Sequence, residues 1–111
     1  MEARERIAVY YQLPSGPPSP FGVWRHSIPD KRARAAVDAR IARFRDGNFG
    51  DSRPIGDGAS ESRIDWGPGY RIYYGVHGDT IVLLCGGDKS DQAADIEKAQ
   101  RYWADYKKRV K

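Results

Sequence analysis

The chain has 111 residues, a length that predicts a single domain over residues 1–111, and a formal net charge of +4. Its composition, 40% hydrophobic and 31% charged, is typical of a soluble globular protein. No apolar run reaches the ~20 residues of a membrane-spanning helix, and residues 1–11 lack the apolar core of a signal peptide, so the sequence predicts a cytoplasmic protein without a membrane partner. Cys85 is the only cysteine, which excludes an internal disulfide and a multi-cysteine metal site.

The predicted elements begin with a strand at 6–11, whose sequence RIAVYY is rich in β-branched and aromatic residues. A proline-rich loop at 12–20 leads to a short helix at 21–28. Asp30 is the predicted N-cap of a second helix, which carries apolar residues at helical spacing and ends at Gly47. Residues 47–59 are predicted to form a connecting loop.

Three strands and a final helix are predicted in the second half, the strands at about 59–66, 70–76 and 80–86. The third strand is apolar throughout, which is typical of a central strand covered on both faces. Ser90 is the predicted cap of the final helix. Its expected apolar stripe consists of Ile96, Ala99, Trp103, Tyr106 and Val110. The order β-α-α-β-β-β-α predicts an α+β domain with a mainly antiparallel sheet.

Basic residues are concentrated in the first half of the chain. Residues 1–54 contain ten Lys/Arg and six Asp/Glu, whereas residues 55–111 contain nine of each. Thirteen of the 19 cations are arginine, whose planar guanidinium binds phosphate through two hydrogen bonds. This distribution predicts a nucleic acid or an acidic protein as partner, unless the arginines only form the solvated face of a helix.

Alternation in the strands predicts that Arg63 and Arg71 lie on the same face of adjacent antiparallel strands, opposite Ile64 and Ile72. If the two strands pair as a hairpin, their apolar faces must coincide, because a slip of one residue would exchange the faces. This condition requires a loop with an odd number of residues around the segment GPG.

Further polar residues are expected beside these two arginines. Glu61 and Tyr73 share their face, and Lys89 directly follows the neighbouring strand. We interpret the cluster as an anion site for phosphate or RNA, in which a tyrosine stacks on a base. The alternative is a solvated sheet face in which Glu61 and Asp65 neutralise the cations.

The other candidate residues and motifs are not expected to bind a metal or a nucleotide or to act as a nucleophile. His26 and His77 have no partner histidine or cysteine at metal-ligand spacing, so each is expected to be structural or exposed. The glycine-rich segments GDGAS and GGDKS lack the spacing of a P-loop. Cys85, in an apolar strand, is expected to be a buried small hydrophobic residue.

The segments GNFGDSRPIGDG, ESRIDWGPGYRIYYG and LLCGGDKSDQAADIEKA resemble the signature segments of the RelE/ParE superfamily of bacterial toxins, in its HigB-like "addiction module killer" branch. Together with the helices before them they cover about nine tenths of the chain, in the family's order. The resemblance implies a twisted antiparallel sheet, two N-terminal helices on one face and a concave functional face opposite. It also implies cleavage of messenger RNA at the ribosome, without metal or cofactor, by attack of the 2′-hydroxyl on the adjacent phosphate.

The resemblance assigns roles to particular residues. Arg71 would hold the scissile phosphate and stabilise its developing charge, and Arg63 would be a second phosphate-binding residue. Lys89 matches a position associated with protonating the leaving group, which makes these three the expected catalytic residues. Arg53 and Tyr73 are the expected substrate-binding residues. Arg53 stands where the family more often has lysine, and it is a poor general base because a guanidinium stays protonated. Ser62 stands where relatives tend to have leucine, which predicts looser packing.

Three functions remain open on the sequence. The first is an endoribonuclease toxin that acts on mRNA and the ribosome and is neutralised by a cognate antitoxin, expected to be a small helix-turn-helix protein. The second is a ParE-type toxin that inhibits DNA gyrase and cleaves nothing. The third is a degenerate member that only binds its antitoxin. The cluster of Arg63, Arg71, Tyr73 and Lys89 favours the first.

Overall fold

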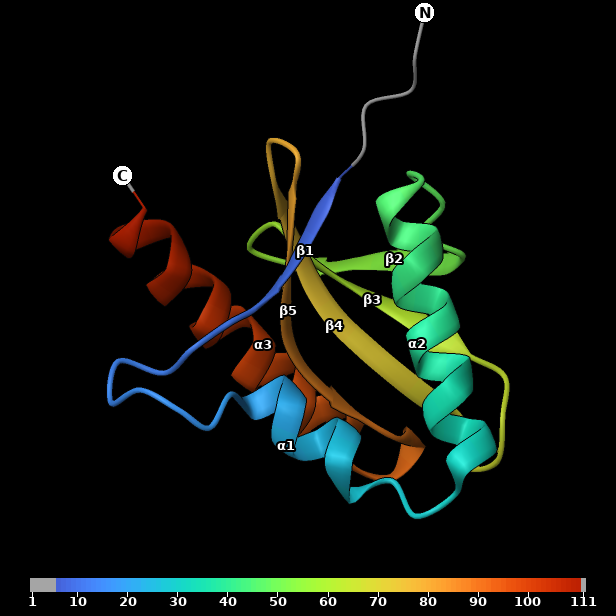
Figure 1. Ribbon diagram of the computed structural model, residues 1–111. Helices are drawn as coiled ribbons and strands as arrows, with labels where there is room; N and C mark the ends of the chain where they lie inside the picture. Colours follow the sequence, from blue (N-terminus) through green and yellow to red (C-terminus); the bar gives the residue numbers. More distant parts are fainter. Residues whose placement is uncertain (1–5, 111) are drawn as a thin grey trace, which may run out of the picture.

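A mixed five-stranded sheet runs through the middle of the protein, with helices on both of its faces (Figure 1). The computed structural model describes residues 6–110, so residues 1–5 and Lys111, which the sequence assigns to the same domain, lie outside this description. The elements in chain order are β1 (Ile7–Tyr10), α1 (Pro20–Ser27), α2 (Lys31–Arg45), β2 (Asp51–Gly56), β3 (Ala59–Ile64), β4 (Tyr70–His77), β5 (Thr80–Gly87), the short 3-10 helix η1 (Lys89–Asp91) and α3 (Gln92–Arg109).

The strands are arranged in the order β1-β5-β4-β3-β2. β1 pairs with β5 in parallel, and every other neighbouring pair is antiparallel, so the predicted α+β class with a mainly antiparallel sheet is confirmed. β5 lies between β1 and β4 and is covered on both faces, as its apolar sequence predicts. Ile81 and Leu83 are buried on the α1/α2 side, and Val82 and Leu84 on the α3 side.

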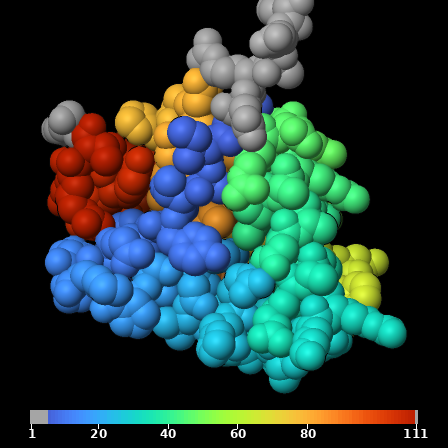
Figure 2. All heavy atoms as spheres, viewed as in Figure 1, coloured from blue at the N-terminus to red at the C-terminus, as the bar shows by residue number. Residues whose placement is uncertain are grey.

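Helices α1 and α2 cover one face of the sheet, and together with β1 they hide most of β4 and β5 in the space-filling view (Figure 2). The prediction that Asp30 caps α2 is confirmed, because its carboxylate accepts a hydrogen bond from the backbone N–H of Arg32 at 2.9 Å. Gly47 follows the helix with a φ of +84° and donates to the carbonyl of Phe44, as expected of a C-terminal glycine. The predicted stripe of Ala33, Val37, Ile41 and Phe44 is buried.

The prediction of a loop at 47–59 is wrong, because this segment contains strand β2. β2 pairs antiparallel with β3 and forms the edge of the sheet. Pro54 has no N–H for a ladder, which an edge strand tolerates because one of its sides has no neighbour. A register shift between Pro54 and Gly56 further obscures the alternation. Arg53 is therefore a residue of the sheet and not of a loop.

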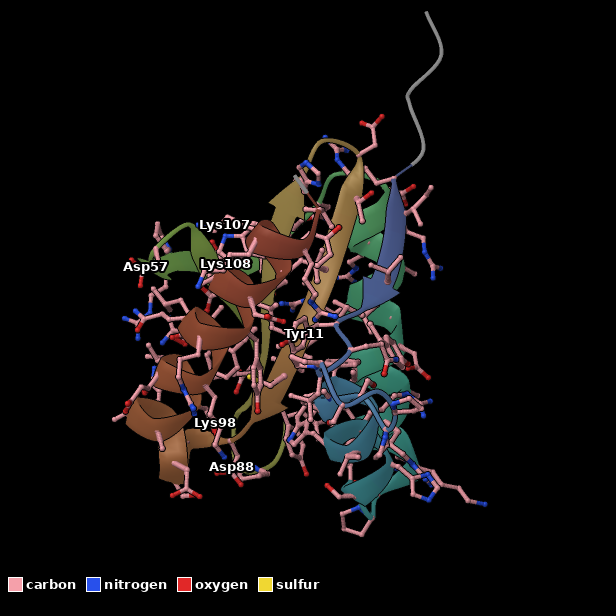
Figure 3. The ribbon with its side chains drawn as sticks, turned by 90° about the vertical axis from the view of Figure 1, so that its left-hand side faces the viewer. Tyr11, Asp57, Asp88, Lys98, Lys107 and Lys108 are labelled. Carbon is pink, nitrogen blue, oxygen red and sulfur yellow. The ribbon has the colours of Figure 1, made fainter. Side chains whose placement is uncertain are left out.

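Helix α3 covers the opposite face, so that the sheet is enclosed between α3 and the pair α1 and α2 (Figure 3). Ala99 and Trp103 are buried as predicted, whereas Val110 is 40% exposed. The prediction that Ser90 caps this helix is wrong: the carboxylate of Asp88 accepts bonds from the N–H and hydroxyl of Ser90, and α3 begins only at Gln92. None of the helices within residues 6–110 combines the length and hydrophobicity that a membrane crossing requires.

Candidate functional site: a basic cleft beside the β3–β4 hairpin

Arg63 and Arg71 are direct partners in the register of β3 and β4, and they lie on the α3 side of the sheet. Ile64 and Ile72 are buried on the other side, against α1 and α2. The loop between the paired residues Ile64 and Tyr70 comprises residues 65–69, an odd number. The predicted placement of the two arginines is confirmed.

A cleft of about 380 Å³ opens at this end of the sheet. Its lining includes the three expected catalytic residues, Arg63, Arg71 and Lys89, although they come from β3, β4 and η1. The remaining lining residues are Arg40, Asp51, Ile64, Asp65, Gly69 and Tyr70. We call this site the basic cleft, because four cationic side chains face two carboxylates in it.

Arg71 is the most deeply buried cation of the basic cleft. It is only 6% exposed. Its Nε lies 3.2 Å from Oε2 of Glu61, and its Nη1 donates to the carbonyl of Gly69 at 3.1 Å. Nη2 has no hydrogen-bond partner among residues 6–110. A guanidinium that is held on two sides and still has free donors is preorganised to bind an anion.

Glu61 is the buried centre of the polar network beneath the basic cleft. Its side chain is completely buried and accepts hydrogen bonds from Arg71, Arg53 and Gln92. Gln92 is the first residue of α3, so this carboxylate also ties the helix to the sheet. The expected neutralisation of the cations by Glu61 is therefore present. Glu61, Arg71 and Tyr73 are buried on this face and not solvated, however, whereas Arg63 at its end stays exposed.

The exposed pairings of the basic cleft are looser. Arg63 forms an ion pair with Asp51 at 3.2 Å, and both side chains are well exposed to solvent. Asp65, which was also expected to neutralise the arginines, has no ion pair among the described residues. Lys89 likewise has no ion pair within residues 6–110, so its ammonium group is available to a ligand.

Arg40 in α2 is a cleft residue that the sequence did not reveal. Its Nη1 donates to Ser62 Oγ and to the carbonyl of Arg63, both at 2.8 Å. Burial is the main cause that lowers the pKa of Arg40, and the neighbouring Arg43 adds to it. Ser62 is completely buried and donates to the carbonyl of Phe49, so it forms a bonded contact in place of the looser packing expected there.

The two expected substrate-binding residues do not line the basic cleft. Tyr73 is completely buried in the apolar cluster under α3, so the expectation that it stacks on a base is inconsistent with the structure. Burial, followed by the negative charge of Glu61, raises the pKa of this tyrosine. Arg53 lies on β2 with a side chain that is 55% exposed and bonds Glu61 from outside the cleft. The aromatic ring that does line the cleft is Tyr70.

The remaining chemical candidates lie away from the basic cleft. Cys85 is buried as expected, and this burial raises the pKa of its thiol to about 12, so it is protonated at neutral pH. His26 is exposed on α1, and His77 is exposed at the end of β4, where its ring contacts Tyr106. Neither histidine lines the cleft.

Comparison with known proteins identifies a relative in Haemophilus influenzae, which is described as an uncharacterized protein. The two sequences are 47% identical over 81 residues, which is 72% of this chain and 82% of the relative. No protein-family model matches the chain, and no solved structure matches it. The chain belongs to the same protein family as this Haemophilus influenzae protein.

Proposed function

We propose that this chain is the toxin of a type II toxin–antitoxin system, a HigB-like member of the RelE/ParE superfamily that cleaves messenger RNA at the ribosome. The proposal is supported by the resemblance of its sequence segments and by the helix-covered, mainly antiparallel sheet. The observation that carries it is the convergence of Arg63, Arg71 and Lys89 in one cleft. These residues come from β3, β4 and η1. By resemblance, Arg63 and Arg71 match phosphate-binding positions of the family, and Lys89 matches the position associated with protonating the leaving group.

The chemistry is an internal transfer. The 2′-oxygen of one nucleotide bonds to the phosphorus, and the bond from phosphorus to the 5′-oxygen of the next nucleotide breaks. Arg71, with its free Nη2, stabilises the negative charge that builds on the phosphate oxygens, and Arg63 binds the same group. Lys89 gives a proton to the leaving 5′-oxygen. Tyr70 takes the stacking role that was expected of Tyr73.

The remaining step removes the proton of the 2′-hydroxyl. Arg53 is a guanidinium and lies outside the basic cleft, so it is not the base. Asp65 lines the cleft and has no ion pair among the described residues, which leaves its carboxylate free to accept the proton. Asp51 is less suited because it is paired with Arg63. We assign Asp65 the role of general base.

The test is to incubate the protein with ribosomes that carry a defined message and to map the ends of any fragments. Wild-type protein should cut within the decoding site, and Asp65→Asn and Lys89→Ala should each cut roughly 10²–10⁴-fold more slowly. Asp57→Asn is the matched control, because Asp57 lies in the turn between β2 and β3 and does not line the cleft. Intact message with wild-type protein would refute the proposal.

An antitoxin-binding module without catalysis is the second candidate. It is favoured by one observation, namely that Arg53 and Arg71 share the carboxylate of Glu61 while Arg63 is paired with Asp51. Such pairing neutralises charge that a substrate phosphate would otherwise meet. Expression without antitoxin distinguishes the two, because only an active toxin arrests bacterial growth. A supercoiling assay with DNA gyrase tests the ParE-type function in parallel.

The expected partner is a cognate antitoxin of the helix-turn-helix class, in the cytoplasm. The basic surface of α2 is one place where an acidic partner would bind, because most of its arginines are exposed. Reversing exposed charge there, for example by Arg32→Glu, should weaken antitoxin binding and leave cleavage of RNA unchanged.

A further inference from the structure

A second pocket lies where the end of β5 meets α1 and the beginning of α3, and its volume is about 310 Å³. Its lining includes three acidic residues, Asp88, Asp91 and Asp95, and two glycines of β5, Gly86 and Gly87. No lysine, arginine or histidine of the described residues belongs to its lining. We call it the acidic pocket. It contrasts with the chain as a whole, whose formal net charge is +4.

Asp95 distinguishes the acidic pocket from a group of surface carboxylates, because it is largely buried. Its side chain lines the pocket, and the residue is only 9% exposed. Its carboxylate has no hydrogen bond and no ion pair within residues 6–110. The chain makes room for it, because a Cβ at Gly87 would lie 2.0 Å from Oδ2. The Asp95 oxygens are not among the fully buried polar atoms, so they are open to the pocket, where a cationic ligand could pair with them.

The charges around Asp95 are mostly negative. Burial raises the pKa of Asp95, the charge of Lys98 one turn along α3 lowers it, and Asp91 and Asp88 raise it again. Hydrogen bonds from Ser90 lower the pKa of Asp88, so that carboxyl remains ionised. Asp88 and Lys98 both lie at this end of the molecule, near the start of α3 (Figure 3). A cation entering the pocket would therefore meet at least two carboxylates.

The other walls favour a planar cation. Trp24 and Tyr70 both line the pocket, and their rings form an edge-to-face pair with centroids 6.1 Å apart. The last residue of α1, Ser27, also lines it, and the C-terminal end of a helix carries partial negative charge. A guanidinium can bond carboxylates through its fork and contact aromatic rings with its plane, which an ammonium ion does less well.

We propose that the acidic pocket binds the guanidinium group of an arginine side chain presented by a partner protein. A metal ion is a poorer occupant, because no three His, Cys, Asp or Glu side chains of the described residues are arranged to hold one. The volume lies at the lower end of the range for small-molecule sites, so it fits one side chain better than a larger ligand. This binding does not require RNA cleavage, because none of the three aspartates lines the basic cleft, although Tyr70 lines both sites.

The test is an NMR titration of the isotope-labelled full-length chain with N-acetyl-arginine methylamide. We expect saturable shifts of the Gly86 and Gly87 amides and of the Trp24 indole N–H, with a dissociation constant that is roughly millimolar. The citrulline analogue, which has the same shape without the charge, should leave these signals unmoved. The absence of saturable shifts, or equal shifts with citrulline, would overturn the proposal.

Two variants and two competitors complete the experiment. Asp91→Asn should weaken binding by about tenfold and keep the fold, because Asp91 makes no side-chain hydrogen bond at the start of α3. Glu97→Gln removes the same charge from an exposed position of the same helix and should leave the dissociation constant unchanged.

If magnesium moves the same NMR signals at lower concentration than the arginine compound, the site is a metal site. If agmatine binds at least about tenfold tighter than the blocked arginine, the ligand is a free guanidinium compound. Either result contradicts the assignment to a protein partner.

Discussion

Replacing Glu61, which lies beneath the basic cleft, by glutamine should strongly destabilise the protein. The substitution keeps the size of the side chain but removes the charge that Arg71 binds, and the Arg71 side chain is only 7% exposed. Breaking a buried ion pair on one side costs about 3–5 kcal/mol, because the remaining charge stays buried. The pair with Arg53 adds at most about 1 kcal/mol, since that side chain is 55% exposed. Glutamine can still accept one hydrogen bond, so we expect a loss of about 3 kcal/mol in the free energy of unfolding.

The assay is urea denaturation followed by tryptophan fluorescence. With a slope of about 2 kcal/mol/M, a loss of that size lowers the midpoint by about 1.5 M. Asp51→Asn is the control, because it removes the carboxylate from the exposed pair with Arg63 and should cost less than about 1 kcal/mol. The double variant Glu61→Gln/Arg71→Gln should be less destabilised than the sum of its single variants. Equal midpoints for Glu61→Gln and Asp51→Asn would show that the buried network contributes no more than a surface pair.

Three further outcomes follow from particular contacts. Lys89→Ala should leave the urea midpoint unchanged, because the structure gives this lysine no ion pair within residues 6–110; a lowered midpoint would show that it has a structural role. Gly75→Ala should lower the free energy of unfolding by about 1–3 kcal/mol, measured in the same way, because a Cβ there would lie 2.4 Å from the Trp103 ring. Burial, followed by the hydrogen bond to Asp105, raises the pKa of Tyr11 from 10.0 to about 12. Its contribution to the free energy of unfolding is complete below pH 10 and is lost as the pH rises to about 12. The melting temperature of the wild type should therefore fall over that range by more than the melting temperature of Tyr11→Phe.

The shared face of Arg63 and Arg71 could be predicted because the side-chain period of a strand is two. Once both strands must bury their apolar residues on one side, a slip of one residue is excluded. β2 could not be recognised in the same way. It has a single neighbour, contains Pro54 and shifts register before Gly56, so it lacks the alternation that identifies a half-buried strand.

The sequence could not show which helix covers the second face of the sheet. Alternation along β4 places Tyr73 on the same face as polar residues. That face is buried by α3, and the sequence of a single strand does not show which distant helix packs against it. Arg40 was missed for a related reason, because its bonds reach Ser62 and Arg63 on a different element. Arg71→Ala would disturb the fold as well as the site, since this substitution leaves Glu61 buried with fewer partners. Arg71→Lys is the better variant for kinetic work.

The parallel pairing of β1 with β5 has a consequence for the newly made chain. Ile7 pairs with Thr80 and Tyr10 with Leu83, so the first strand has no partner until most of the chain has left the ribosome. Residues that α1 and α2 bury, such as Ile81 and Leu83, are also synthesised late. Contacts between residues so distant in sequence slow folding and prolong the exposure of apolar surface. The emerging polypeptide therefore needs its final third before the apolar faces of its N-terminal helices are fully buried.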